Sequence, residues 1–329
     1  MNCGDSVATQ KVLVTGCGGE LGSLITSVLE DEAWVGPILG VDADPPRRRL
    51  RRADFRRIAL NRTAAVSQII LDFDPHVIVH VGVWEPNARL SPDEAERTTS
   101  DVGRAVFDAA HQAPSLEAVV VRSGLEVYGT RSHAPLTPTD TTTPAPASLF
   151  GRMLQFLERQ AADLRAARGV AVANLRLASV LGAHVPSPLG RLLRLPAVPF
   201  LLPSDPPFTV IEDHDAALAF RLAASHRFDG AINIAADGTT TARRAAIQGR
   251  RLPVPVVGPG WWATEKIANL AGAPVPDHVV EMLRHGRLAH ASDNAHLIRF
   301  SPRHSTHEVI ERLYEWPSVV RVPAAMKVA

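Results

Sequence analysis

Short apolar runs alternate with segments of helical spacing along most of the chain. Such runs are typical of strands buried in a parallel sheet, whereas apolar residues repeated every three or four positions indicate amphipathic helices. The expected strands are residues 12–15, 38–41, 76–83, 118–122, 170–176 and 231–235, and the expected helices are 21–30, 63–73, 92–111, 148–168 and 210–224. This alternation predicts an α/β fold built on a doubly wound parallel sheet.

A glycine-rich turn joins the first expected strand to the first expected helix. Gly16, Gly19 and Gly22 follow the spacing G-x-x-G-x-x-G, which permits a tight turn, a close backbone approach and close packing of helix on strand. The helix N-terminus then offers free N–H groups and a positive dipole end to a pyrophosphate. The turn predicts a Rossmann-type dinucleotide site with these candidate binding residues: Gly16, Gly18, Gly19, Glu20, Leu21 and Gly22.

Other candidate binding residues follow the ends of further strands. Asp42 closes the second strand, 26 positions after Gly16, where a carboxylate holds the adenosine ribose. It would repel a 2′-phosphate, so we expect NAD rather than NADP; the alternative is a turn or capping aspartate. Val81, Gly82 and Ser123 also lie at strand ends, and we expect them in the same crevice because parallel strands end at one edge of the sheet.

The pattern changes after residue 182. Residues 186–207 are rich in proline and leucine with little periodicity, and predict a loop or short helices over the crevice. A helix at 243–250 and an edge strand at 253–257 should follow, since prolines suit sheet edges. We expect a nucleotide-binding domain of residues 10–175 and 207–238, a smaller substrate-side lobe of 176–206 and 239–322, and tails at 1–9 and 323–329.

Charge and composition narrow the function classes. Lys and Arg total 35 against 34 Asp and Glu, so no global field attracts nucleic acid. The two cysteines cannot form a disulfide framework, and no apolar run approaches the ~20 residues that span a bilayer. No spacing of His, Cys, Asp or Glu suggests a metal. We expect a cytoplasmic protein without a membrane span.

Two clusters leave alternatives open. The arginines between Arg47 and Arg57 indicate a solvated loop or helix face, or else an anion site at the adenosine edge or a surface for an acidic partner. Trp261 and Trp262 precede an expected helix and indicate core or lid packing, or else a partner surface or an apolar ligand wall.

Taken together, these motifs resemble the extended short-chain dehydrogenase/reductase superfamily, in its NAD-dependent sugar epimerase/dehydratase branch, over about residues 10–240. Besides the glycine turn, the resemblance rests on Asp54-Phe55, Val127-Tyr128-Gly129, residues 175–182, residues 213–217 and Asn233. It implies NAD as cofactor, adenine contacts from Asp54 and Phe55, and a nucleotide sugar or other small molecule as a possible ligand. It also implies a possible homodimer that pairs through the helices at 92–111 and 148–168.

The chain departs from the family at its catalytic positions. The family uses a Ser or Thr hydroxyl and a Tyr-x-x-x-Lys pair, and the matching positions here hold Gly124, Phe150 and Leu154. The chain has two tyrosines, Tyr128 and Tyr314, and neither is followed four positions later by lysine. Because phenylalanine has no ionisable proton, the usual proton transfer lacks its acid/base, a loss of about 10²–10⁴ in rate.

Three nearby residues are weak substitutes. Glu126 falls where the dehydratase branch places an acid/base glutamate, although a surface or capping role is the alternative. Ser123 could supply a hydroxyl from a shifted backbone, or make a strand-end hydrogen bond. Tyr128 is expected to be packed and bonded through its hydroxyl.

Three functional hypotheses follow. The first is an NAD-binding protein without the family's usual catalysis, acting as a cofactor-responsive sensor, a scaffold or an accessory subunit. The second is an active epimerase, dehydratase or oxidoreductase on a nucleotide sugar that uses non-standard residues. The third is an interaction module that no longer binds nucleotide.

Overall fold

The structure is a computed structural model of the 329-residue chain. It describes residues 9–59, 62–86, 90–130, 137–257, 275–289 and 293–316. Trp261, Trp262 and the helix expected after them lie outside the described residues, as do nearly all of the two expected tails.

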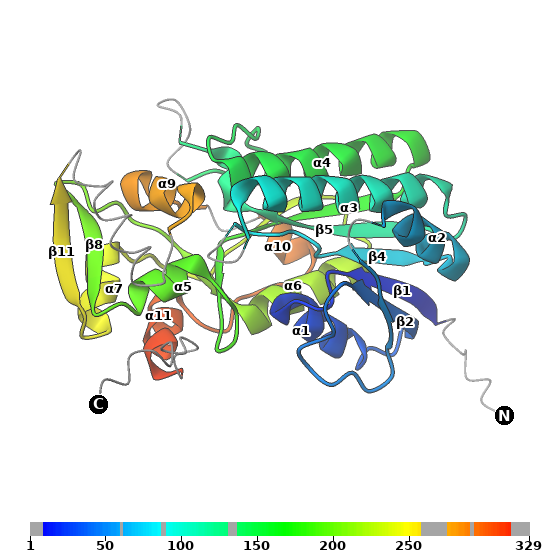
Figure 1. The fold of residues 1–329 in the computed structure, drawn as a ribbon, viewed down its shortest axis with the longest axis horizontal. Helices are drawn as coiled ribbons and strands as arrows, with labels where there is room; N and C mark the ends of the chain where they lie inside the picture. The colour runs from blue at the N-terminus through cyan, green and yellow to red at the C-terminus, as the bar shows by residue number, and fades with distance from the viewer. Residues whose placement is uncertain are drawn as a thin grey trace, which may run out of the picture.

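A seven-stranded parallel sheet forms the centre of the larger part of the molecule (Figure 1). Its strand order is β10-β6-β5-β4-β1-β2-β3, so the order reverses direction on either side of β1 and β4, as in doubly wound sheets. The strands are β1 (Gln10–Thr15), β2 (Val35–Asp42), β3 (Asp54–Arg57), β4 (Val77–His80), β5 (Ala118–Gly124), β6 (Ala171–Leu177) and β10 (Gly230–Ile234). The predicted α/β fold class is confirmed.

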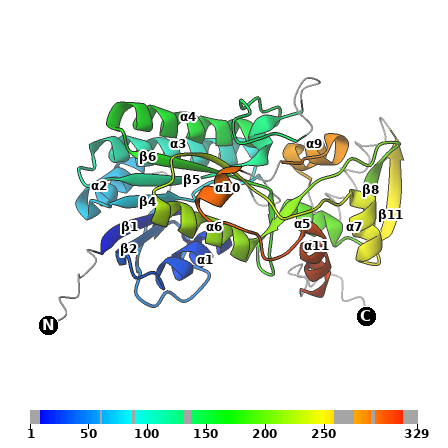
Figure 2. The same ribbon diagram turned by 180° about the vertical axis from the view of Figure 1, so that it is seen from behind.

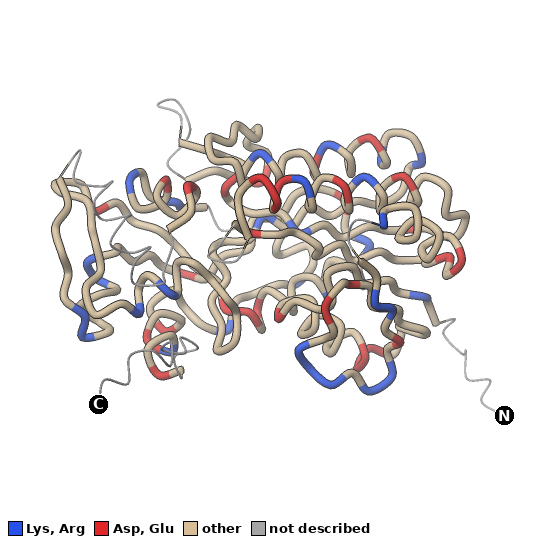
Figure 3. Tube along the Cα trace, in the orientation of Figure 1, with Lys and Arg blue, Asp and Glu red and all other residues tan. Residues whose placement is uncertain are grey.

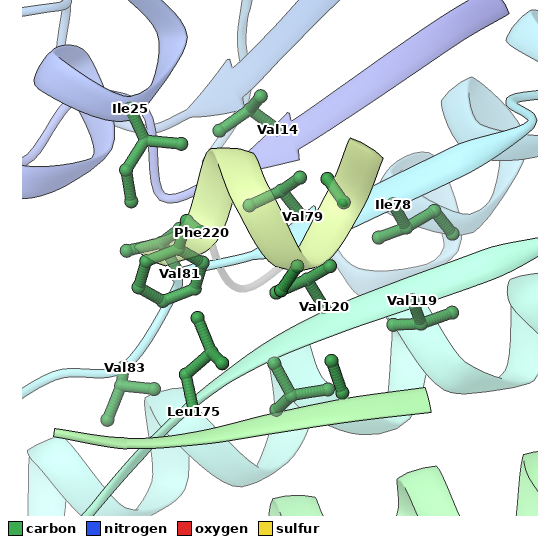
Figure 4. Close-up of a cluster of buried hydrophobic side chains, with 14 of the residues drawn as sticks. Val14, Ile25, Ile78, Val79, Val81, Val83, Val119, Val120, Leu175 and Phe220 are labelled. Carbon is green, nitrogen blue, oxygen red and sulfur yellow. The ribbon is translucent and has the colours of Figure 1, made fainter. Parts of the chain in front are cut away.

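Helices cover both faces of this sheet. On one face α2, α3 and α4 pack side by side, and on the other α1 packs against α6 (Figures 1 and 2). Their bounds are α1 (Glu20–Leu29), α2 (Thr63–Phe73), α3 (Pro92–Gln112), α4 (Leu149–Arg168) and α6 (Asp213–His226). Phe220 of α6 and Ile25 of α1 meet the branched side chains of the central strands, among them Val14, Val79 and Val120 (Figure 4).

A second, separate hydrophobic core lies at the other end of the molecule. It contains Leu193, Phe208 and Met282, all fully buried or nearly so. The elements around this core are β7 (Ser179–Leu181), α5 (Pro188–Leu193), β8 (Ala197–Leu202), β9 (Val210–Glu212), α7 (Ala242–Gln248), β11 (Leu252–Val257), α9 (Asp277–His285) and α11 (Thr306–Glu315). Two shorter elements, η1 (Leu125–Tyr128) and α10 (Asp293–Leu297), adjoin the large sheet.

Three local expectations need correction. Residues 186–207 contain a short helix, as expected, but also the strand β8, which pairs in parallel with β11. The segment expected as a helix from 210 begins as the strand β9. Residues 54–57 at the end of the arginine-rich stretch form the edge strand β3 rather than a loop or helix face. In each case a distant strand supplies the hydrogen bonds that local periodicity does not report.

The edge strand β11 shows why its prolines are tolerated. The backbone N–H of Leu252 donates to the carbonyl of Pro196 at 2.9 Å, so this residue faces the partner strand. Alternate residues face the other edge, which places Pro253 and Pro255, without N–H groups, on the side away from β8. Within the described part of the chain, no helix is long and apolar enough to cross a membrane.

Candidate functional site

The glycine turn brings three backbone segments together with no room for side chains. Gly16 has φ +77°, and a Cβ there would lie 2.6 Å from the backbone nitrogen of Gly82. A Cβ on Gly22 would meet the backbone of the turn, with Gly16 C at 2.7 Å and Cys17 Cα at 2.9 Å. Gly19 precedes the first residue of α1. The N-terminus of α1 therefore opens directly onto the ends of β1 and β4.

A cleft of about 230 Å³ runs along this edge of the sheet. Its lining includes most of the predicted binding residues, namely Gly16, Gly18, Gly19, Glu20, Leu21, Gly22, Asp42, Val81 and Gly82. Three predicted residues do not line it. Asp54 and Phe55 lie in the edge strand β3, and Ser123 lines the smaller cavity beyond. Sequence reasoning missed Trp84, Leu90, Arg122 and Val185, which also line the cleft. Arg47 and Pro186 line it too, and they belong to segments that the sequence placed at the adenosine edge and over the crevice.

Asp42 is both a turn residue and part of the cleft wall. Its carboxylate accepts the backbone N–H of Gly18 at 2.9 Å, of Ala43 at 2.6 Å and of Asp44 at 3.2 Å. Burial raises the pKa of Asp42, against these hydrogen bonds, which favour the charged form. The carboxylate thus ties the glycine turn to the end of β2, and the two roles considered for it are compatible.

Arginines cluster in the segment after β2 (Figure 3), and part of this cluster has a structural role. The buried carboxylate of Glu30 accepts the backbone N–H groups of Arg51, Arg52 and Ala53 at 2.7–2.9 Å. The Arg52 guanidinium donates to several carbonyls of the turn after α1, including that of Val35 at 3.0 Å. These bonds explain part of the cluster without any ligand.

Of two other arginines in the segment, one lines the cleft and the other pairs with a residue that lines it. Arg48 forms an ion pair with Glu20 at 3.1 Å, which offsets a carboxylate at the helix terminus where a pyrophosphate would bind. Arg47 is exposed and lines the cleft itself. The anion-site alternative for this cluster stays a prediction, and Arg47 is the arginine of the segment that lines the cleft.

A smaller cavity of about 50 Å³ is lined by Gly124 and Phe150, two of the three residues predicted to match the family's catalytic positions. The space beside Gly124 is taken by other side chains, because a Cβ there would overlap the Glu126 Oε2 atom and lie 3.0 Å from Leu154 Cδ1. The Phe150 ring packs against the His278 ring with centroids 4.7 Å apart. Leu154 is fully buried. The Glu126 carboxylate thus lies beside Gly124, where the family is expected to carry its hydroxyl. The His278 imidazole packs on Phe150, the residue predicted at the tyrosine position, and Leu154 is the residue predicted at the lysine position.

Buried ion pairs join this region to α9 and the residues after it. Arg287 contacts Glu126 at 2.9 Å and Glu281 at 3.5 Å. His278 contacts Glu85 at 2.9 Å. Glu126 is only 5% exposed, so the surface role considered for it is wrong.

Ser123 and Tyr128 belong to a second buried network. The Ser123 hydroxyl donates to Glu158 at 2.6 Å, and Glu158 receives two bonds from Arg176 at 2.8 and 2.9 Å. Arg176 also donates to the Tyr128 hydroxyl at 2.9 Å, and this hydroxyl donates to Asn233 at 2.6 Å. Tyr128 is packed and hydrogen-bonded as predicted, and Ser123 makes the strand-end hydrogen bond. Both hydroxyls therefore have hydrogen-bond partners within the protein.

Protonation of His278 should make the stability of the protein pH-dependent. Burial opposes the charge, but Asp277 and Glu85 outweigh it and raise the pKa of His278 from 6.5 to about 9; Glu126 acts in the same direction. The raised pKa stabilises the fold fully below pH 6.5, and this contribution is lost as the pH rises through 9. We expect the free energy of unfolding to fall by on the order of 3 kcal/mol between those values.

Chemical denaturation at pH 6.5 and at pH 9.5 measures this change. His278→Gln should largely remove the slope, whereas the same substitution at the exposed His226 should keep it. An equal slope in the wild type and in the His278 variant would contradict the assignment.

Among the described residues there is no group of three or more His, Cys, Asp or Glu side chains that could hold a metal ion.

Known proteins resemble this chain in sequence and in fold. The NAD dependent epimerase/dehydratase family model matches residues 12–195. An uncharacterized protein of Mycobacterium tuberculosis is 31% identical over 264 residues, which cover 78% of this chain and 70% of the relative. The methionine adenosyltransferase 2 subunit beta of Bos taurus is 27% identical over 174 residues, covering 52% of this chain and 47% of its own length.

Solved structures match over almost the whole chain. The UDP-glucose 4-epimerase from Brucella ovis, in complex with NAD, has a TM-score of 0.71 and 18% identity, covering 93% of this chain and 97% of its own. A dTDP-glucose 4,6-dehydratase from Bacillus anthracis, in complex with NAD, has a TM-score of 0.70 and 14% identity, covering 94% and 96%. The chain belongs to the NAD-dependent epimerase/dehydratase family.

Proposed function

We propose that this protein binds NAD but does not carry out the family's usual hydride-coupled proton transfer. It acts instead as a cofactor-responsive sensor, a scaffold or an accessory subunit. The observation that carries the proposal is the packing around Gly124 and Phe150. Glu126 occupies the space of a side chain at the first, and the ring of the second packs on His278 rather than presenting a hydroxyl.

The two ends of the crevice differ in a way that supports this proposal. The glycine turn and the cleft along it keep the backbone shape of a dinucleotide site. At the other end, the ion pairs of Glu85 and Glu126 with residues 278 and 287 surround a cavity of about 50 Å³. Similarity to a protein named as a subunit of a methionine adenosyltransferase favours an accessory role over an independent enzyme.

Calorimetric titration with NAD, ADP-ribose and NADP tests the proposal. We expect NAD and ADP-ribose to bind within roughly threefold of each other, in the micromolar to millimolar range. The reason is that the missing tyrosine and lysine would each have contributed roughly 1–3 kcal/mol at the nicotinamide ribose. NADP should bind more weakly, since Asp42 places a negative charge at the ribose end.

Each other result favours a different hypothesis. NADP binding as tight as NAD would mean that Arg47, on the same cleft, overrides Asp42. Much tighter binding of NAD than of ADP-ribose would mean that the protein still contacts the nicotinamide riboside half of NAD. Absence of heat with all three ligands would leave the interaction module.

The competing function is an active enzyme that uses Glu126. Its carboxylate lines the small cavity, where it could exchange a proton with a ligand. The test is to incubate the NAD-loaded protein with UDP-sugars and follow the absorbance of reduced nicotinamide. We expect no turnover; turnover that is lost in Glu126→Gln would establish the enzyme instead.

A homodimer through α3 and α4 is part of the same proposal. These two long helices pack side by side on one face of the sheet (Figure 1). Light scattering on the purified chain gives the mass in solution, and a monomer at all concentrations would exclude this pairing.

A further inference from the structure

A half-buried arginine lies between the cleft and the small cavity. Arg122 stands two residues before Gly124, near the end of β5, and lines both spaces. Its guanidinium donates from Nη1 to the carbonyl of Val83 at 3.3 Å. An arginine has five N–H donors, so most of its hydrogen-bonding capacity is left for whatever enters the two spaces.

The acids around Arg122 are matched to other cations. Glu85 pairs with His278 at 2.9 Å, and Glu126 pairs with Arg287 at 2.9 Å. Within the described part of the chain, Arg122 forms no ion pair of its own. Burial lowers the pKa of Arg122, while Glu85 and Glu126 favour its charged form, so the side chain remains a cation at neutral pH.

The remaining lining of the small cavity is mostly apolar. Phe150, Val180 and Leu189 contribute to it, and its volume of about 50 Å³ has room for about three or four water-sized atoms. Glu85 and Glu126 line the cavity as well, and each is paired with another cation. A planar, forked cation beside apolar side chains matches a carboxylate that carries a short apolar group. A nucleotide sugar is far larger than this space.

We propose that the small cavity is a binding site for a small carboxylate, which Arg122 holds through bidentate hydrogen bonds. The site adds a second ligand to the protein and does not depend on the proposed loss of catalysis. Glu85 and Glu126 lie nearby and repel an anion, which makes the binding weak, in the millimolar range. The carboxylate form of the ligand is bound, so affinity falls where the acid is protonated.

Acetate is the probe, because it has about four non-hydrogen atoms and fits the space. Its binding is followed by ligand-observed NMR on the whole chain without dinucleotide, at constant ionic strength. We expect saturable binding to the wild type and a loss of about 10- to 100-fold in affinity for Arg122→Gln. Arg122→Lys keeps the charge without the fork and should bind in between. Inorganic phosphate is the larger, tetrahedral comparison and should bind more weakly than acetate.

Arg159→Gln is the matched control, because Arg159 is exposed on α4, and it should bind acetate like the wild type. Val180→Leu, which narrows the cavity without touching the charge, should weaken acetate and provides a second test if Arg122→Gln does not fold. Unsaturable acetate signals in the wild type, or unchanged binding in both the Arg122 and Val180 variants, would overturn the proposal. The acetate results do not depend on whether the protein binds NAD or turns over a substrate, so the two proposals can fail separately.

Discussion

Replacing Gly22 by alanine is expected to unfold the nucleotide-binding region and to abolish dinucleotide binding. The added Cβ would overlap the Gly16 carbonyl oxygen and lie 2.7 Å from its carbon and 2.9 Å from Cys17 Cα. All three are backbone atoms of a turn that β1, β4 and α1 hold in place, so none can move aside cheaply. We expect a loss of about 3 kcal/mol or more in the free energy of unfolding. Chemical denaturation measures this loss, and ADP-ribose titration measures the binding.

Gly19→Ala provides the matched control within the same turn. A Cβ at Gly19 would lie 3.5 Å from the nearest atom, the Gly16 carbonyl oxygen, which is ordinary contact. Gly19 also has φ −71°, which alanine adopts without strain. Its loss as a helix-capping residue should cost about 1 kcal/mol or less. Equal destabilisation by the two substitutions would show that the turn is not sterically limited at Gly22.

The elements near the glycine turn could be predicted because their signals are local. The apolar run of β1, the turn glycines and the spacing of α1 follow one another within a short stretch, and Asp42 closes the next strand. The apolar run of β8, residues 197–202, was harder to recognise because prolines at positions 196, 199 and 203 flank and interrupt it. Its partner β11 begins 55 positions later, at residue 252 against 197. Pairing across that distance makes the segment a strand, and the local pattern alone does not report it.

At the end of the crevice around the small cavity, the sequence predicted only which functional groups are missing. The sequence predicts that Gly124, Phe150 and Leu154 stand at the family's catalytic positions without its functional groups, but it does not indicate what surrounds them. The groups that do so are distant in the chain: Arg287 meets Glu126 across 161 positions, and His278 meets Glu85 across 193. Each is a charged residue whose burial could not be inferred from its neighbours, since charged residues are rarely buried without a partner. The same contacts place the Glu126 carboxylate in the space that a side chain at position 124 would take.

Arg287→Met should strongly destabilise the protein because it leaves two buried carboxylates without their cation. Glu126 is 5% exposed and Glu281 is 9% exposed, and Arg287 contacts both. Methionine fills similar volume but supplies no charge, and removing one partner of a buried ion pair costs about 3–5 kcal/mol. The arginine also donates to the His278 carbonyl at 3.1 Å, so the end of α9 loses a hydrogen bond too. Chemical denaturation of the wild type and the variant at neutral pH measures the difference.

Three further variants separate charge from packing. Arg104→Met removes an ion pair with Asp101 whose side chains are both more than half exposed, and it should cost about 1 kcal/mol at most. Adding Glu126→Gln to Arg287→Met should recover part of the lost stability, because a neutral amide needs no cation. Glu126→Gln alone should destabilise the protein, because it leaves Arg287 with Glu281 as its one carboxylate partner. If the double variant is less stable by the full sum of the two single effects, then residues 126 and 287 do not act as a pair. In that case the substrate end of the crevice is held together by packing around Phe150 instead.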